Sequence, residues 1–272
     1  MAYKRILSVQ DISCVGKCSL SVALPILSAC GHEVCILPTA VLSTHTGMKT
    51  KPVVHHLDGS LPGFREHWER EDVRFDIIST GYLGSIGAID QVLEITDTLL
   101  LPGGKLIVDP AMADHGRLYS GLDETYAKAI RRLCSKADIL LPNITEAAML
   151  ADMPYRDLSE EYISELLQKQ PCDRVILTGV GYVSDETGAE IFEGNVQKSY
   201  RHLRFPHNYH GTGDIFAACV TGAVASGKDL YSSAKIASDF TAMAIENTWN
   251  APEGCYGVKF EPCLWRLCEM MK

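Results

Sequence analysis

The segment with the clearest chemical signature is Gly211-Thr212-Gly213-Asp214, which stands directly before a run of small residues of helical length, Ile215–Gly227. Two glycines let the backbone turn so that successive N–H groups converge, and a helix start adds partial positive charge. Such a turn can bind an anion. A carboxylate at its edge could accept a proton from an alcohol while the N–H groups stabilise a transferring phosphoryl group. The alternative is that Asp214 is simply an acidic residue favoured by the helix dipole.

Three further polar residues could contact a hard cation and phosphate oxygens. Asn143 and Glu146 lie three residues apart at a predicted helix start, so their side chains face the same edge, and Mg²⁺ prefers such oxygen ligands. Asp109 ends an apolar run and precedes Pro110, a costly place for a charge unless a cation is near. For Glu146 the alternative is a first-turn Glu that only complements the helix dipole.

Short β-branched runs alternate with amphipathic stretches, which is typical of a parallel sheet with helices on both faces. Short alternating runs after Gly179 predict antiparallel strands that finish the sheet edge, Glu190–Phe192 and Gln197–Leu203. The predicted parallel strands are Arg5–Val9, Glu33–Pro38, Phe75–Ser79, Lys105–Asp109, Ile139–Leu141 and Arg174–Thr178. The predicted helices are Ser19–Ala29, Ala88–Leu99, Glu124–Cys134, Thr145–Ala151, Ser159–Lys169, Thr212–Ser226 and Leu230–Asn247.

In such sheets ligands bind beyond the carboxyl ends of the strands. Polar segments gather at those ends, and together they predict a substrate cleft along one edge. These segments are Gln10–Asp11, Ser43–Thr46, Gly81–Tyr82, Asp109–Asp114, Asn143–Glu146, Thr178–Gly179 and Gly211–Asp214.

Composition narrows the class of protein. A chain of 272 residues, 46% hydrophobic, is near the upper size for one core, so we expect one domain over residues 1–272. A net charge of −9 gives no general attraction to nucleic acid or anionic lipid. The N-terminal apolar stretch is too short for a signal peptide and no run approaches a membrane span, so we expect a cytoplasmic protein.

Several apparent motifs do not hold. The ten cysteines are scattered through apolar segments and are interpreted as reduced thiols; Cys14 and Cys18 have no second pair at zinc spacing. Gly16-Lys17-Cys18-Ser19 lacks the upstream glycine of a P-loop. Gly179-Val180-Gly181 lacks the third glycine of a dinucleotide fingerprint, which argues against a dehydrogenase.

The combination of motifs resembles the ribokinase superfamily. Gly211–Asp214 resembles its signature, while Asp109–Asp114 and Leu141–Glu146 resemble the DPVMGD-type and PNxxE segments of the vitamin-kinase branch. Gly81-Tyr82 and Ser43–Thr46 resemble that branch's TGY and SNHT elements. The chain is therefore similar to the pyridoxal/pyridoxamine (vitamin B6) kinases. The resemblance implies an α/β fold: a ribokinase-like three-layer αβα sandwich whose central sheet is mostly parallel with antiparallel edge strands.

The resemblance also implies roles for individual residues. Asp214 would be the catalytic base, with the amides of Gly211, Thr212 and Gly213 stabilising the transferring group. Asp11, Thr46 and Tyr82 would hold a B6 vitamer. ATP would lie against Asp109, Asp114, Tyr119, Asn143 and Thr178, with its adenine near Asn247 to Gly257. Mg²⁺ would be held near Glu146, Asn143 and Asp109, a monovalent cation such as K⁺ could take part, and the protein would be a homodimer.

Three alternatives remain open. Hydroxymethylpyrimidine kinases share the Asp-Pro-Ala-Met segment but usually carry Cys where Asp214 stands. Sugar and nucleoside kinases usually have a lid insertion near the second strand, and none is visible. A non-catalytic vitamin-binding relative would not need an intact Asp214 and Glu146. Asp11 departs from the well-known pyridoxal kinases, which carry Ser there, so the choice of vitamer stays open.

Overall fold

The computed structural model describes residues 3–205, 209–249 and 256–272. A nine-stranded sheet runs through it in the order β11-β10-β9-β8-β5-β4-β1-β2-β3. Neighbouring strands from β9 to β2 pair in parallel, whereas β10 and β11 at one edge and β3 at the other are antiparallel. The strands are β1 Arg5–Ser13, β2 Glu33–Leu42, β3 Val54–His56, β4 Phe75–Thr80, β5 Leu100–Val108, β8 Ile139–Leu140, β9 Arg174–Thr178, β10 Glu186–Glu193 and β11 Val196–Leu203.

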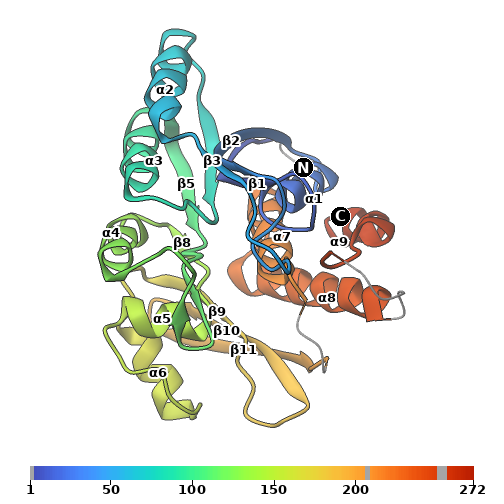
Figure 1. Cartoon of the computed structure of the whole chain (residues 1–272). Helices are drawn as coiled ribbons and strands as arrows, with labels where there is room; N and C mark the ends of the chain where they lie inside the picture. Colours follow the sequence, from blue (N-terminus) through green and yellow to red (C-terminus); the bar gives the residue numbers. More distant parts are fainter. Residues whose placement is uncertain (1–2, 206–208, 250–255) are drawn as a thin grey trace.

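Helices cover both faces of the sheet (Figure 1). One face packs against α2 to α6 and the other against α1, α7, α8 and α9, so the hydrophobic core divides into two clusters. Short 3₁₀ turns precede α2 and α9, at Asp58–Ser60 and Glu261–Cys263. The helices are α1 Leu20–Ala29, α2 Leu61–Arg70, α3 Ile86–Leu99, α4 Glu124–Cys134, α5 Ile144–Leu150, α6 Glu160–Gln168, α7 Thr212–Ala225, α8 Leu230–Trp249 and α9 Leu264–Met270.

Local sequence explains where these helices begin and how closely they pack. Asp123 precedes α4 and its side chain accepts a hydrogen bond from the backbone N–H of Tyr126 at 3.0 Å, as an N-cap does. The small residues of α7 let it approach α1, because a Cβ on Gly222 would lie 2.4 Å from the Sγ of Cys30. The close approach lies near the end of α7, beside the end of α1.

The predicted fold class is confirmed, including the parallel strands and the antiparallel edge. The sequence did not predict α2, α9, β3 or the small hairpin of β6 (Ala113–Asp114) and β7 (Arg117–Leu118). Strand β10 also begins earlier than predicted, at Glu186, and contains Gly188. A Cβ there would lie 2.0 Å from the carbonyl oxygen of Tyr200 on β11, so this glycine permits pairing rather than ending it.

Within the described residues, no helix is both long enough and apolar enough to cross a membrane.

Candidate active site

The Gly-Thr-Gly-Asp segment forms an open helix start. Gly211 is the N-cap of α7 with φ of 86°, and a Cβ there would lie 2.1 Å from the carbonyl oxygen of Lys17, so both conformation and space require glycine. No side chain among the described residues caps this turn, and a Cβ on Gly213 would meet nothing within 4 Å. The first N–H groups of α7 therefore face open space, where an anion can reach them.

Asp214 lies next to this turn and is linked to Asp11 through Ser19. Burial raises the pKa of Asp214 to about 6; a hydrogen bond from the backbone N–H of Ser19 opposes the rise, and the nearby Asp11 adds to it. The hydroxyl of Ser19 donates to Oδ1 of Asp11 at 2.5 Å. Burial raises the pKa of Asp11 as well, against the hydrogen bond from Ser19. Sequence reasoning missed Ser19, whose position before α1 suggested only a helix start.

The neighbouring strands β1 and β4 bring Asp11 and Tyr82 together. The backbone N–H of Asp11 donates to the carbonyl of Tyr82 at 3.1 Å, and the strand register between β1 and β2 slips by one residue at this point. Burial and the Asp11 carboxylate raise the pKa of Tyr82. The rings of Tyr82 and Tyr119 have centroids 6.4 Å apart. Three of the residues expected at the site thus share one corner of the sheet edge.

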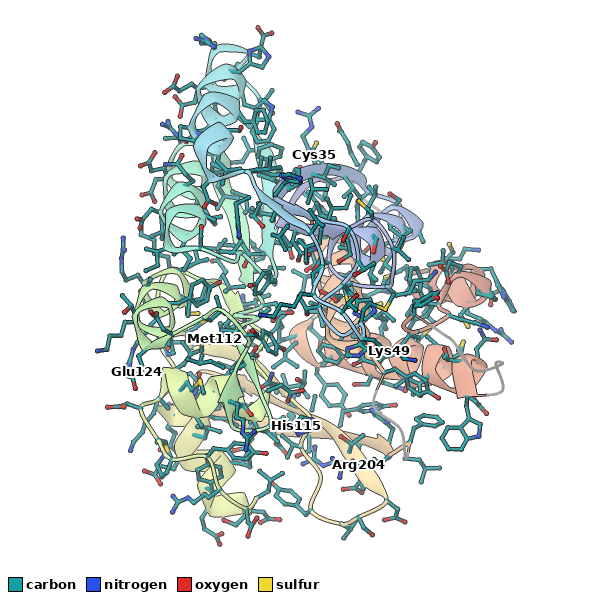
Figure 2. The ribbon with its side chains drawn as sticks, in the orientation of Figure 1. Cys35, Lys49, Met112, His115, Glu124 and Arg204 are labelled. Atoms are coloured by element: carbon teal, nitrogen blue, oxygen red, sulfur yellow. The ribbon has the colours of Figure 1, made fainter. Side chains whose placement is uncertain are left out.

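The loop between β2 and β3, which also carries Lys49 (Figure 2), folds over the start of α7. The ring of the buried His45 lies 4.8 Å from that of His210, a contact that the sequence did not predict. Thr46, next to His45, is exposed. Within the described residues His45 Nε2 and Thr80 Oγ1 are buried without a hydrogen-bond partner, so this corner retains polar capacity for a ligand.

Asn143 and Glu146 form a capping box at the start of α5. Asn143 Oδ1 accepts from the N–H of Glu146 at 3.0 Å, and Glu146 Oε2 accepts from the N–H of Asn143 at 2.9 Å. Glu146 Oε1 accepts from the N–H of Met112 (Figure 2) at 3.1 Å, while Asn143 Nδ2 donates to the carbonyl of Ala113 at 2.8 Å. Burial raises the pKa of Glu146 to about 7. The pair therefore holds the segment that follows Asp109.

The other residues expected to contact the phosphates of ATP lie around this capping box. Burial, together with the Glu146 and Asp214 carboxylates, raises the pKa of Asp109 well above its usual value. Asp114 is exposed on the β6–β7 hairpin, whose tip includes His115 (Figure 2). The backbone of Thr178 bridges that of Asn143. Of the expected adenine region, residues 250–255 lie outside the described residues.

The acidic corner at Asp109 and Glu146 carries oxygen groups of the kind that Mg²⁺ prefers. Among the described residues no group of three or more His, Cys, Asp or Glu side chains is arranged as a metal cage. The carboxyls of Asp109 and Glu146 nevertheless repel one another, and repulsion of this kind favours a cation nearby. Mg²⁺ commonly binds through one or two carboxylates plus substrate phosphates and water. The corner therefore fits a cation that arrives with a triphosphate.

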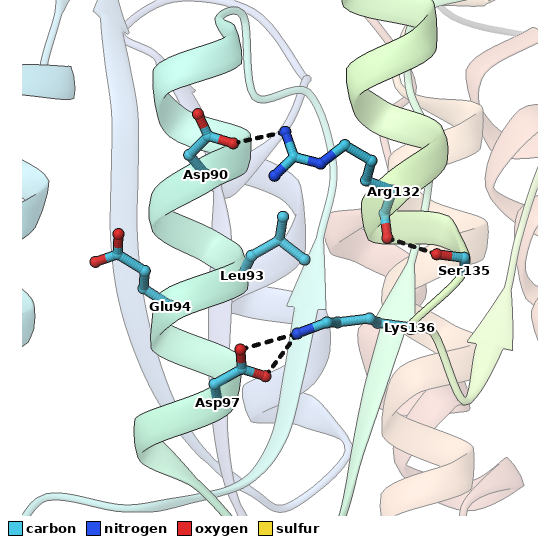
Figure 3. Close-up of a pocket in the computed structure, with 7 residues that line it drawn as sticks. All are labelled: Asp90, Leu93, Glu94, Asp97, Arg132, Ser135 and Lys136. Atoms are coloured by element: carbon cyan, nitrogen blue, oxygen red, sulfur yellow. Dashed lines mark hydrogen bonds and ion pairs between the residues drawn. The ribbon is translucent and has the colours of Figure 1, made fainter.

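A separate surface groove of about 600 Å³ lies between α3 and α4 (Figure 3). Its charges are paired: Arg132 with Asp90 at 3.0 Å and Lys136 with Asp97 at 2.8 Å. None of the residues that line it belongs to the carboxyl edge of the sheet. The groove therefore has no part in the site described above.

A mostly parallel sheet between two helical layers, with an open Gly-Thr-Gly-Asp turn at its carboxyl edge, defines a ribokinase-like α/β protein. The family model of phosphomethylpyrimidine kinase matches residues 39–259, and the chain belongs to that family.

Relatives of known description agree with this assignment. The pyridoxal kinase of Arabidopsis thaliana is 30% identical over 233 residues, which cover 80% of this chain and 73% of that protein. The crystal structure of pyridoxal kinase from Lactobacillus plantarum superposes with a TM-score of 0.90 at 32% identity, covering 99% of this chain and 98% of that one. A Bacteroides thetaiotaomicron protein named as a phosphomethylpyrimidine kinase, solved with pyridoxal, gives a TM-score of 0.91 at 34% identity, covering 98% and 96%.

Proposed function

We propose that this protein is an ATP-dependent kinase that phosphorylates the 5′-hydroxymethyl group of pyridoxal, pyridoxamine or pyridoxine. The observation that carries the proposal is the pairing of Asp214, at the open start of α7, with Asp11 across Ser19. The proposed base, the proposed anion site and the proposed acidic partner for a ring nitrogen would thus share one corner. Similarity to pyridoxal kinases over nearly the whole chain supports the same reading.

Asp214 is the proposed catalytic base. With a pKa of about 6 its carboxylate is mostly ionised at neutral pH, yet basic enough to accept a proton from the 5′-hydroxyl. The hydroxyl oxygen then bonds to the γ-phosphorus, the bond from that phosphorus to the β–γ bridging oxygen breaks, and ADP leaves. The open N–H groups at the start of α7 stabilise the charge on the transferring group.

Asp11 is the proposed partner of the vitamer ring. One of its oxygens accepts from Ser19, and the other is proposed to accept from the pyridinium N–H, much as an Asp does in pyridoxal-phosphate enzymes. Tyr82 and Thr46 are proposed to contact the same vitamer from the ends of β4 and β2. The pyridinium would also supply the cation that a buried carboxylate needs.

ATP is proposed to lie with its phosphates against Asp109, Asp114, Tyr119, Asn143 and Thr178. Magnesium bound with the triphosphate would neutralise the charge of the phosphate oxygens. Asp109 would hold it directly and Glu146 through water, while the amide of Asn143 keeps the capping box closed. Through their bonds to Met112 and Ala113, Glu146 and Asn143 would hold the segment after Asp109 in place beside the metal.

A coupled assay of ADP release tests the proposal with four alcohols: pyridoxal, pyridoxamine, pyridoxine and hydroxymethylpyrimidine. Turnover of at least one B6 vitamer with a kcat/KM above that for the pyrimidine is expected. The second candidate, a hydroxymethylpyrimidine kinase, is favoured by the family whose model the chain matches. A preference for the pyrimidine would replace the main proposal with that candidate.

The protein is further proposed to act as a homodimer. Ile36, Val53 and Val54 are exposed apolar side chains near the β2–β3 edge, which a second copy could cover. Light scattering at micromolar concentration should give twice the chain mass, and a monomer would contradict the proposal.

A further inference from the structure

Ser19 adopts a backbone conformation that serine normally avoids. Its φ of 54° and ψ of −131° are those of a position usually filled by glycine in tight turns. The residue is buried, and its carbonyl accepts the N–H groups of Val22 and Ala23 that begin α1. Strain of this kind persists only where the surrounding structure imposes it, and it is often found at functional sites.

The hydroxyl of Ser19 is also used in an unusual way. A serine before a helix commonly accepts a hydrogen bond from an N–H of the first turn, but Ser19 makes no such cap. Its hydroxyl donates instead to Oδ1 of Asp11 at 2.5 Å, and its backbone N–H donates to the carboxylate of Asp214. A glycine would fit the backbone better but would lose the first of these bonds.

We propose that Ser19 is a positioning residue that holds Asp11 and Asp214 in a fixed relation, Asp11 through its hydroxyl and Asp214 through its N–H. This inference rests on the roles proposed above for the two carboxylates. With Ser19 on one oxygen, the other oxygen of Asp11 is directed to the vitamer ring. The hydroxyl also stabilises Asp11 as a carboxylate beside Asp214, where burial alone would favour its protonated form.

Two substitutions separate positioning from folding. Ser19→Ala removes the hydroxyl and keeps the strained backbone, whereas Ser19→Gly removes the hydroxyl and relieves the strain. Both should lower kcat/KM for the vitamer by about 10-fold, mainly through KM. The pH below which KM for the vitamer rises should move upward by about one unit, because Asp11 loses a charge-assisted hydrogen bond, while the acid limb of kcat, which depends on Asp214, should stay in place. Their melting temperatures should differ, with Gly above Ala.

Other titratable groups lie near these two carboxylates, so the pH dependence needs a matched control. Ser21→Ala is the matched control, since the hydroxyl of Ser21 donates to the carbonyl of Cys18 at 2.7 Å, and the pH dependence of KM in this variant should be that of wild type. The titratable groups coupled to Asp11 or Asp214 are Cys18, Tyr82, Asp109 and Tyr119.

A double-mutant cycle completes the test. If the hydroxyl acts through Asp11, Ser19→Ala combined with Asp11→Ala should be no slower than Asp11→Ala alone. If both Ser19 variants had wild-type kinetics while Asp11→Ala was impaired, this inference would be overturned and the proposed function would stand. If Ser19→Ala lost both activity and melting temperature while Ser19→Gly kept both, the loss would come from folding, and this inference would also be overturned. Wild-type kinetics of Asp11→Ala would instead overturn the proposed role of Asp11.

Discussion

The two sides of the site differ in how far the protein satisfies its own polar groups. At the start of α7 the turn has no side-chain cap among the described residues, the space beside Gly213 is open, and Ser19 is strained. At the start of α5, Asn143 and Glu146 pair with each other and with the backbone of Met112 and Ala113. The first side leaves its helix start open, whereas the second uses its helix start to hold the segment after Asp109.

Similar sequence signals at the two helix starts have different uses in the folded protein. Both segments place an acidic residue in the first turn of a helix, where the dipole favours it. Glu146 makes the reciprocal bonds of a capping box, whereas Asp214 receives an N–H from a different element. Five predictions test this contrast between the two helix starts.

Asp214→Asn should have the largest effect. Turnover should fall roughly 10²–10⁴-fold with little change in ATP affinity, because a positioned proton acceptor is lost while the shape of the turn is kept. Steady-state kinetics measure both. Turnover within a few-fold of wild type would mean that Asp214 is only an acidic residue favoured by the helix dipole.

The same variant should be more stable than wild type above neutral pH. Folding raises the pKa of Asp214 above its ordinary value of 3.8 to about 6, so its contribution to stability is present below pH 4 and is lost as pH rises through 6. At pH 8, Asn should therefore raise the free energy of unfolding by about 1–3 kcal/mol, and the gain should vanish near pH 4. Denaturant titrations at both pH values check this sign.

Asp11→Ala should have the second largest effect on the kinetics. Loss of one charge-assisted hydrogen bond to the ring nitrogen should lower kcat/KM by roughly 10–150-fold for all three vitamers alike. If Asp11 only supports the turn, kinetics should hardly change while the melting temperature falls. A loss confined to pyridoxamine would move Asp11 from the ring nitrogen to the aminomethyl group.

The wild-type pH profile tests the electrostatics of the open side. Since the proposed base Asp214 must be ionised to accept a proton and its pKa is about 6, kcat should fall about tenfold per pH unit below that value. The Asp214→Asn variant should lose this dependence in its residual activity. An acid limb near pH 4 in the wild type would indicate that another group limits the reaction.

Glu146→Gln should have the smallest effect on turnover and act mainly on stability. The new amide would present N–H₂ to backbone donors that now meet a carboxylate, which should cost about 1–3 kcal/mol of unfolding free energy. The Mg²⁺ concentration for half-maximal rate should also rise, because a nearby charge is removed. Glu124→Gln, in the exposed first turn of α4 (Figure 2), is the matched control and should change neither. If the magnesium titration of Glu146→Gln were unchanged, Glu146 would have no role at the metal site.

The sequence by itself determined the parallel strands, the edge at which polar residues gather, and the open turn at Gly211. These features rest on short-range signals: β-branched runs, turn residues after each strand, and two glycines before a helix of small residues. The antiparallel pair β10–β11 was likewise predicted from local alternation, although its first strand was predicted to begin only at Glu190, and Gly188 in fact leaves space for the backbone of Tyr200. Local patterns suffice where the constraint itself is local.

Only the tertiary structure decided how the site is connected. The bond from Ser19 to Asp11 depends on a positive φ imposed by the loop, and the cap at Glu146 reaches Met112, 34 residues earlier in the chain. His45 meets His210, and Tyr82 meets Tyr119, only because the strands and loops that carry them converge at one edge. No residue pattern encodes such meetings, since burial and hydrogen bonding are satisfied by whichever groups the folded chain brings into contact.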